Sequence, residues 1–413
     1  MSELRRAIYI GCSFAFKPLC SLVVLRALAG SFGEEGFGYL TQYMAFLAVV
    51  FGLSLGGASN YLIKNLSQTS RVVACEKEVS VVFSYGFLFL CLLAICFVFL
   101  KGSLEEFIFY RSVSWWVIFY ILIVFFISNV CGILMAVALA QGKTNRYVLA
   151  NIGGAALFVL IVVCLVLVGA EDGIYWALPL SYILPVVFLY RTFEGKIRLD
   201  FKLLWANRRL VQVFRFCLIV YVGLVSIPVI SILVRESFHQ QFGAVELSYW
   251  QVAVKISDTV QQFYGMFCSA ILLPYLSRKI GDFHFSGWFK KLLGVSGVYF
   301  LGALIIFSFR EYFVSLLFGE GYSSAKNYVS YYLIGDYFRV CALFCSFTLI
   351  SADRFGRALI FEFLQGLLFV SLFYYFSMGN NSIDVGYAYI LTYSICFLVM
   401  LGFVFNYFNG RRI

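Results

Sequence analysis

The chain has 413 residues, of which 62% are hydrophobic and only 13% are charged, and its formal net charge is +10. Soluble domains carry about 25% charged residues and expose most of their residues to water, so a soluble core of this size could not hide so much apolar surface. The composition therefore excludes a cytosolic enzyme, a disordered chain and a secreted disulfide scaffold, and it predicts a protein that crosses a membrane many times.

Apolar runs of spanning length recur along the whole chain. No connection between them is long enough for an independent soluble domain, so the function must be carried by the spans. Lys17 and Pro18 interrupt the first run, and no cleavage site with small residues follows it, which indicates a retained span rather than a signal peptide. The predicted fold class is an all-α polytopic membrane protein with about 12 transmembrane helices. They are expected at residues 7–28, 37–61, 80–100, 115–140, 148–168, 174–190, 216–234, 248–274, 292–309, 328–350, 358–376 and 386–407.

The basic residues predict the orientation of these spans. If both termini are cytosolic, most of the 31 Lys and Arg residues fall in cytosolic segments, as the positive-inside rule requires. The basic segment 191–215 is then expected to lie along the anionic inner leaflet. The net positive charge is thus explained without a nucleic-acid partner. The opposite side holds only Lys101, Arg111, Arg235, Arg310 and Lys326.

The two halves of the chain look related. Three matched pairs lie the same number of positions apart: Pro18 with Pro228, Phe32-Gly33 with Phe242-Gly243, and Tyr39 with Tyr249. Chance matching in an apolar sequence is the alternative. Six spans per repeat would insert both copies the same way up, with a pseudo-twofold axis along the membrane normal. We therefore expect two six-helix lobes, residues 1–205 and 206–413, around a central cavity.

The strongest polar pattern lies in the eighth expected span. Gln251, Lys255, Asp258 and Gln262 are spaced so that all four share one helical face. Charged groups at membrane depth are costly and normally face a cavity or a partner. The stripe therefore indicates either the lining of a wet cavity or an internal pair of Lys255 with Asp258 that holds helices together.

Other charged residues in the spans have the same two kinds of interpretation. Lys17 lies too deep in its span to snorkel comfortably, so it faces a cavity or a structural partner. Arg26 is close enough to the outer end to snorkel. Asp336 and Arg339, three positions apart, favour a local ion pair, and Glu362 either caps its helix or snorkels.

Motifs for catalysis are missing from the sequence. We find no GxxxxGK[ST] loop, no acidic pair for a sugar nucleotide in a sizeable cytosolic loop, and no histidine placed as an acyltransferase base. The cysteines fall almost entirely in apolar runs, no CxxC occurs, and His239 and His284 lie in different loops. The sequence predicts no metal and no cofactor, and it favours transport over catalysis.

At these residues the chain resembles bacterial lipid-linked oligosaccharide flippases, of the O-antigen translocase and enterobacterial common antigen lipid III flippase type. The stretches that carry the resemblance are YWQVAVKISDTVQQFYGMFCSAILLPYLSR (249–278), SFGEEGFGYLTQY (31–43), GGASNYLIK (56–64) and IGDYFRV (334–340). The resemblance covers the whole chain in order. It implies the fold of the multidrug/oligosaccharidyl-lipid/polysaccharide exporter superfamily. Lys255 departs from the family, which carries a small polar residue there.

The resemblance also implies a function and a site. The substrate would be an oligosaccharide repeat unit linked to undecaprenyl pyrophosphate, moved from the cytosolic to the periplasmic leaflet of the bacterial inner membrane by alternating access. The pyrophosphate of such a substrate needs cations and its sugars need hydrogen-bonding groups, so the candidate headgroup-binding residues are Lys17, Arg26, Lys255, Gln251 and Gln262. The implied ion-coupling residues are Asp258 first, then Asp336 and Glu362.

Partners and alternative functions follow from the same resemblance. The partners would be the lipid-linked substrate, membrane lipids, and a polysaccharide polymerase with its chain-length regulator. One alternative is another exporter of the superfamily, for drugs or another lipid-linked precursor. A membrane enzyme of surface glycan assembly is a weaker alternative.

Overall fold

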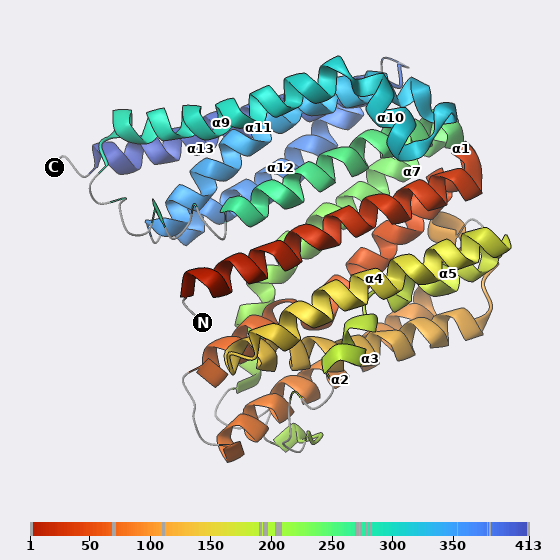
Figure 1. Cartoon of the computed structure of the whole chain (residues 1–413), viewed down its shortest axis with the longest axis vertical. Coiled ribbons are helices and arrows are strands. Elements are labelled where there is room, and N and C mark those ends of the chain that lie inside the picture. Colours follow the sequence, from red (N-terminus) through yellow and green to blue (C-terminus); the bar gives the residue numbers. More distant parts are fainter. Residues whose placement is uncertain are drawn as a thin grey trace. The chain divides into compact units, whose positions relative to one another are not determined.

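The computed structural model describes residues 3–67, 72–109, 112–189, 192, 197–202, 209–268, 272, 275–276, 280, 283–352, 354–377, 379 and 381–410. Every regular element in this part of the chain is a helix (Figure 1). Eight of the described helical segments are long and apolar enough to cross a membrane. The predicted class, an all-α polytopic membrane protein, is thereby confirmed. The predicted lobe boundary at residues 205 and 206 lies outside the described residues.

By internal contacts the chain forms two compact units. The first unit comprises residues 1–27 and 39–232, and the second comprises residues 28–38 and 233–413. The helix α1 (Glu3–Ser67) contains the first two expected spans, and α7 (Arg209–Phe267) contains the seventh and the start of the eighth. Both long helices therefore contribute residues to both units.

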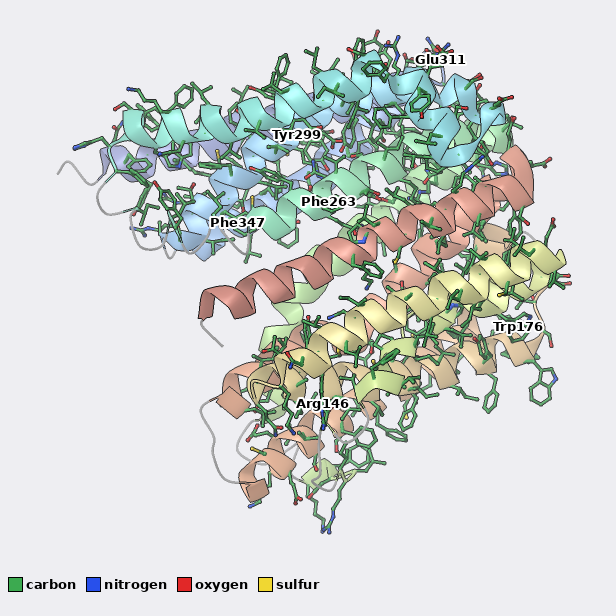
Figure 2. All side chains as sticks on the ribbon, in the orientation of Figure 1. Arg146, Trp176, Phe263, Tyr299, Glu311 and Phe347 are labelled. Carbon is green, nitrogen blue, oxygen red and sulfur yellow. The ribbon has the colours of Figure 1, made fainter. Side chains whose placement is uncertain are left out.

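The first unit is built on α2 (Val72–Leu104), α3 (Trp115–Ala140) and α4 (Thr144–Val168). A π-helical turn, η1 (Glu105–Phe109), extends α2. The end of α1, α2, α3 and the start of α7 share one apolar core around Leu62, Val82 and Val137, all fully buried. Within this unit, Arg146 and Trp176 lie at opposite ends of the helix bundle (Figure 2).

The sixth expected span, residues 174–190, is not one helix. The structure has a short α5 (Glu171–Leu180) followed by turns and the 3-10 helix η2 (Leu184–Leu189). Pro179 and Pro185 interrupt the chain because proline lacks the backbone N–H that a continuous helix needs. The broken segment packs closely on α4, where a Cβ on Gly154 would meet the ring of Pro185 at 2.8 Å.

The second unit is a bundle of four long helices with the latter part of α7. Its elements are α9 (Phe285–Ser308), α10 (Arg310–Phe318), the 3-10 helix η5 (Glu320–Ala325), α11 (Lys326–Ser351), α12 (Phe355–Ser377) and α13 (Asp384–Asn409). Helix α11 packs along α13 and α9, and α12 packs on α13 (Figure 1). The buried Trp288 closes one end of this core, where its Nε1 donates to Thr348 Oγ1 at 2.9 Å.

Glu311 marks the α10 end of the second unit (Figure 2). Lys326 Nζ donates to its carboxylate at 2.6 Å. This ion pair holds the pKa of Glu311 below its usual range. The pair joins the start of α10 to the start of α11.

The two long helices bend at matching glycines. Gly33 has φ 64° and ψ −172°, and Gly243 has φ 86° and ψ 174°. This is a backbone region that only glycine occupies readily. The two glycines belong to one of the sequence pairs from which the repeat was inferred, so the shared bend supports an internal repeat.

Candidate functional site

Helices α11 and α13 approach each other closely because a glycine on each helix lies against a tyrosine on the other. The ring of Tyr389 on α13 lies over Gly335, where any Cβ would overlap it, and the ring of Tyr331 on α11 covers Gly386 in the same way. Small residues allow such close helix contacts in membranes, where association depends on packing. The packing places the Tyr389 hydroxyl beside Asp336, the residue after Gly335.

Asp336 is the centre of a buried polar cluster. Only 1% of its surface is exposed. Its Oδ1 accepts hydrogen bonds from the Tyr389 hydroxyl at 2.7 Å, from Ser257 Oγ at 2.8 Å and from Gln261 Nε2 at 3.3 Å. A buried charge needs such donors to be tolerated. Asp336 is therefore held by the eighth and twelfth expected spans rather than by its own helix.

The cluster continues from Tyr389 to Glu362. Arg339 Nη1 donates to the Tyr389 hydroxyl at 3.2 Å, and its guanidinium lies 5.1 Å from the ring centre of Tyr393. The Tyr393 hydroxyl donates to Gln365 Oε1 at 3.2 Å, and Gln365 Nε2 donates to Glu362 Oε2 at 2.6 Å. Asp336 and Glu362 thus belong to one polar network, which we call the α11–α13 network: Asp336, Arg339, Glu362, Gln365, Tyr389 and Tyr393.

This network extends one interpretation made from the sequence and corrects another. Asp336 and Arg339 interact electrostatically with each other, and the Tyr389 hydroxyl bonds to both, so a third residue belongs to the expected pair. Glu362 is held by Gln365 inside the helix bundle and also interacts electrostatically with Arg339, so it does not simply cap or snorkel. Residues far apart in the sequence supplied these partners.

Ser257 and Gln261, which bind Asp336, lie on one face of α7. The predicted polar stripe, Gln251, Lys255, Asp258 and Gln262, lies on the neighbouring face of α7. Gln251 is fully buried, Lys255 and Asp258 are half-buried, and Gln262 is exposed. Neither polar atom of the Gln251 carboxamide has a hydrogen-bond partner in the part of the chain that the structure describes. The exposure of the stripe therefore increases steadily from Gln251 toward Gln262.

Arg235 joins this stripe, which the sequence did not predict. The sequence placed Arg235 in an outer loop, but it lies within α7 with only 5% of its surface exposed. It interacts electrostatically with both Asp258 and Lys255. The bend at Gly243 folds α7 back, as the 4.8 Å distance between the ring centres of Phe238 and Trp250 shows. Arg235, one turn before Phe238, consequently lies near the turn that follows Trp250.

Lys17 occupies a separate place in the first unit. It lines a cavity of about 180 Å³ together with residues of both arms of α1, of α4 and of the broken segment after it. The other polar residues of the lining are Ser21, Asn151, Ser181 and Tyr182. Arg26, two turns further along α1, has an exposed side chain and does not line this cavity. The structure therefore separates the two cations that the sequence grouped as headgroup ligands on α1.

Several residues of these sites were missed in the sequence analysis. Tyr389 and Tyr393 carried no signal, since they are two of 28 tyrosines. Ser257 and Gln261 are four positions apart, which marks a second polar face on α7 beside the predicted stripe. That spacing was a usable signal for a partner on another helix.

Comparison with known proteins gives relatives over the full length of the chain. It is 23% identical over 414 aligned residues to proteins named lipid III flippase from Escherichia coli (strain K12) and Shigella flexneri, and the alignments cover 97% of this chain and 98% of each relative. No family model matches the chain.

Several solved structures have folds similar to that of this chain. The lipid II flippase MurJ in an inward closed conformation has a TM-score of 0.73 at 15% identity, covering 96% of this chain and 87% of that one. An inward-facing multidrug resistance MATE family transporter of the MOP superfamily has a TM-score of 0.67 at 14% identity, covering 93% of both chains. A MOP superfamily transporter from Pyrococcus furiosus has a TM-score of 0.64 at 13% identity, covering 99% of this chain and 96% of that one. The chain has the fold of MOP superfamily transporters, as the resemblance implied.

Proposed function

We propose that this protein is a flippase for a lipid-linked oligosaccharide, carried on undecaprenyl pyrophosphate, in the bacterial inner membrane. The observation that carries the proposal is the similarity to lipid III flippases along 97% of the chain. The direction of movement is from the cytosolic to the periplasmic leaflet. Both termini are cytosolic, and the two halves, 1–205 and 206–413, act as the two lobes of an alternating-access carrier.

The need to move a hydrophilic glycan through the membrane explains why polar groups lie at membrane depth. A glycan that enters hydrocarbon loses its hydrogen bonds with water, which costs several kcal/mol for each unsatisfied group. Polar side chains that replace water remove this cost while the polyprenyl chain stays in the lipid. The pyrophosphate requires cations, and Lys17, Arg26 and Lys255 take this role, while Gln251 and Gln262 bind sugar hydroxyls.

The α11–α13 network suits ion coupling. It contains two acids, Asp336 and Glu362, and one guanidinium, that of Arg339, so its side chains sum to one excess negative charge. A proton or a small monovalent cation would balance that charge. Asp258 interacts electrostatically with Arg339 and connects this network to the α7 stripe. We propose that these three acids couple transport to an ion gradient, which would make the protein an antiporter.

Complementation tests the function. The chain is expressed in an Escherichia coli strain that lacks its own lipid III flippase, and in strains that lack an O-antigen translocase. Restored surface glycan in one background would identify the class of repeat unit. If the protein is present in the membrane and no background is restored, the flippase proposal is wrong.

Reconstitution tests the mechanism. Proteoliposomes receive a labelled undecaprenyl-pyrophosphate-linked oligosaccharide, and its access to an external glycosidase is followed with and without a pH or sodium gradient. Translocation that ignores both gradients would remove the coupling role from Asp258, Asp336 and Glu362.

Drug export is the second candidate, since the MATE family transporter has nearly the same TM-score. It predicts that the chain lowers the susceptibility of a sensitive strain to cationic compounds. A partnership with a polymerase and its chain-length regulator belongs to the first proposal alone, and cross-linking in the native host would detect it.

A further inference from the structure

A short part of α1 belongs to the second unit. Residues 28–38, which we call the α1 tip, surround the bend at Gly33 and group with residues 233–413, whereas the arms of α1 on either side belong to the first unit. The chain therefore leaves the first unit at residue 27 and returns to it at residue 39. The contacts of the α1 tip decide how firmly the second unit holds a helix of the first.

Tyr322 of η5 binds the bend itself. Carbonyl groups in the last turn before a break in a helix lack a partner within that helix. The Tyr322 hydroxyl lies 2.7 Å from the carbonyl oxygen of Gly33 and 3.2 Å from that of Ala29, so it can donate to either. Only 3% of the Tyr322 surface is exposed. The hydroxyl thus takes the place of water at the end of the first arm of α1.

Aromatic packing seats the α1 tip on α10 and η5 (Figure 1). The ring centre of Phe37 lies 5.9 Å from that of Phe318 and 5.7 Å from that of Tyr322, and all three side chains are almost fully buried. Gly38 lies against α7, where a Cβ would come within 2.9 Å of the Ala244 carbonyl oxygen. The α1 tip therefore has a close-fitting seat on three elements of the second unit.

A second tyrosine binds the tip beside its bend. The Tyr249 hydroxyl donates to Glu34 Oε2 at 2.5 Å, and both residues are half-buried. Glu34 follows the bend glycine directly, and its Oε1 lies beside Gly321 of η5. A hydroxyl that donates to a carboxylate forms a strong hydrogen bond. Because the pair is only half-buried, water can take over both groups when they separate.

The polar residues that hold the α1 tip are not repeated at the second bend. At the spacing that relates Gly33 to Gly243, Glu34 corresponds to Ala244 and Tyr322 corresponds to Ser112. The carboxylate and the capping hydroxyl are therefore specific to the first bend and do not follow from the internal repeat. This difference indicates a role for the α1 tip that the bend of α7 does not share.

The arms of α1 transmit movement of the first unit to the tip. A helix has a rise of about 1.5 Å per residue and does not stretch. The tip therefore cannot stay in its seat if the outer ends of the two units move apart while the arms follow the first unit. The bonds from Tyr322 and Tyr249 come from hydroxyl groups, which can bond to water after separation and re-form when the tip returns.

We propose that the α1 tip is a releasable latch at the predicted outer end of the second unit. It is seated while the carrier is closed to the periplasm, and it leaves Tyr322, Tyr249 and Phe318 when the carrier opens to that side. The proposal rests on the proposed function, because alternating access supplies the movement. Tyr322 and Glu34 set how readily the latch opens.

A disulfide across the seat tests the release. Glu34 Cγ lies 3.9 Å from the position of a Cβ on Gly321, so cysteines at these two positions can be bridged with a small adjustment. The variant E34C/G321C, with the 12 native cysteines replaced, is reconstituted with the labelled lipid-linked oligosaccharide. We expect oxidation to slow translocation at least about tenfold and reduction to restore it, because release of the tip becomes the limiting step.

The single variants E34C and G321C are the controls for this experiment, and neither should respond to oxidation. If the bridged double variant translocates as fast as its reduced form, the α1 tip stays seated throughout transport and the latch proposal is wrong.

A distance measurement tests the latch without transport. Spin labels are attached to E35C on the tip and N327C on α11, two exposed positions, in the full-length protein in lipid nanodiscs. We expect two distance populations. Y322F should raise the ratio of the longer to the shorter one by about two- to tenfold, because the tip loses the hydroxyl that binds Gly33 while the ring packing remains.

The matched control is Y312F, since Tyr312 on α10 is 65% exposed, and it should leave this ratio unchanged. A single distance in both the wild type and Y322F would overturn the proposal, and so would equal effects of Y322F and Y312F.

The outcome can be separated from that of the proposed function. If the spin labels report two distances whose ratio depends on Tyr322 but no lipid-linked oligosaccharide is translocated, the proposed function fails and the latch stands. If the bridged E34C/G321C protein translocates freely, the latch fails and the function stands.

Discussion

At the scale of single residues, Tyr389 combines packing and hydrogen bonding in the second unit. Its ring stacks on Tyr332 with centres 3.9 Å apart, and its hydroxyl bonds to both Asp336 and Arg339. One hydroxyl therefore connects the buried Asp336 to the half-buried Arg339. Loss of that hydroxyl leaves both partners in place, which makes it a cleaner probe than loss of a charge.

Tyr389→Phe is expected to destabilise the protein by about 1–3 kcal/mol, because Asp336 loses a buried hydrogen bond and Arg339 loses a partly buried one. Thermal unfolding of the purified protein measures the stability, and the proteoliposome assay measures transport. The matched control is Tyr387→Phe on the same helix. Tyr387 is 45% exposed, and among the described residues its hydroxyl bonds to that of Tyr331 at 3.3 Å. Equal effects of the two substitutions would contradict the role given to Tyr389.

Lys17 permits a direct test of water access. In a background with the 12 native cysteines replaced, Lys17→Cys should react with a charged thiol reagent, because the side chain at this position lines a cavity that also contains the polar side chains of Ser21, Asn151 and Ser181. Leu25→Cys on the same helix should stay unreacted, since Leu25 is 2% exposed. Labelling is followed by mass spectrometry. If the Lys17→Cys thiol is sealed from the reagent in every transport state, there is no wet cavity at this place.

At the scale of elements, the bends of α1 and α7 depend on two glycines. We expect Gly33→Ala and Gly243→Ala each to cost about 1–3 kcal/mol, because a Cβ is strained in this backbone conformation although both positions have open space around them. Gly30→Ala is the control, because that position is also open but has no positive φ. The midpoint of thermal unfolding is the measurement. A neutral Gly243→Ala would show that the bend can form without glycine.

The contact between α11 and α13 gives another prediction. Gly335→Ala introduces a Cβ where the ring of Tyr389 lies, so the ring and its hydroxyl must move away from Asp336. Overpacking of this kind costs about 1–3 kcal/mol. We expect lower stability and slower transport together. Gly402→Ala on α13 has open space and should leave both unchanged; if it is as harmful as Gly335→Ala, close packing is not the cause.

At the scale of the whole molecule, the charge distribution predicts the topology. A reporter fused after residue 410 should be active in the cytosol, and one inserted between α10 and η5, at Gly319, should be active in the periplasm. The reason is the scarcity of Lys and Arg on the predicted outer side. Paired alkaline phosphatase and fluorescent protein fusions measure this. A periplasmic C-terminus would refute the even number of spans.

The sequence by itself determined that this protein is an all-helical membrane protein, because bilayer thickness and the need to satisfy backbone hydrogen bonds leave a long apolar run few other structures. It also identified Phe32-Gly33 and Phe242-Gly243 as matching positions, and it placed Gln251, Lys255, Asp258 and Gln262 on one helical face. Such features depend on neighbours along one helix, and helical periodicity makes them readable.

Only the tertiary structure decided which charged groups meet. Asp336 is bound from α7 and α13, Glu362 is linked to Asp336 through residues of three helices, and Arg235 lies inside the molecule although its place in the sequence suggested a loop. The structure also showed that the sixth span is interrupted at its prolines and that the broken segment packs on Gly153 and Gly154 of α4. Contacts between distant segments depend on how helices cross and bend, and hydropathy carries no information on that.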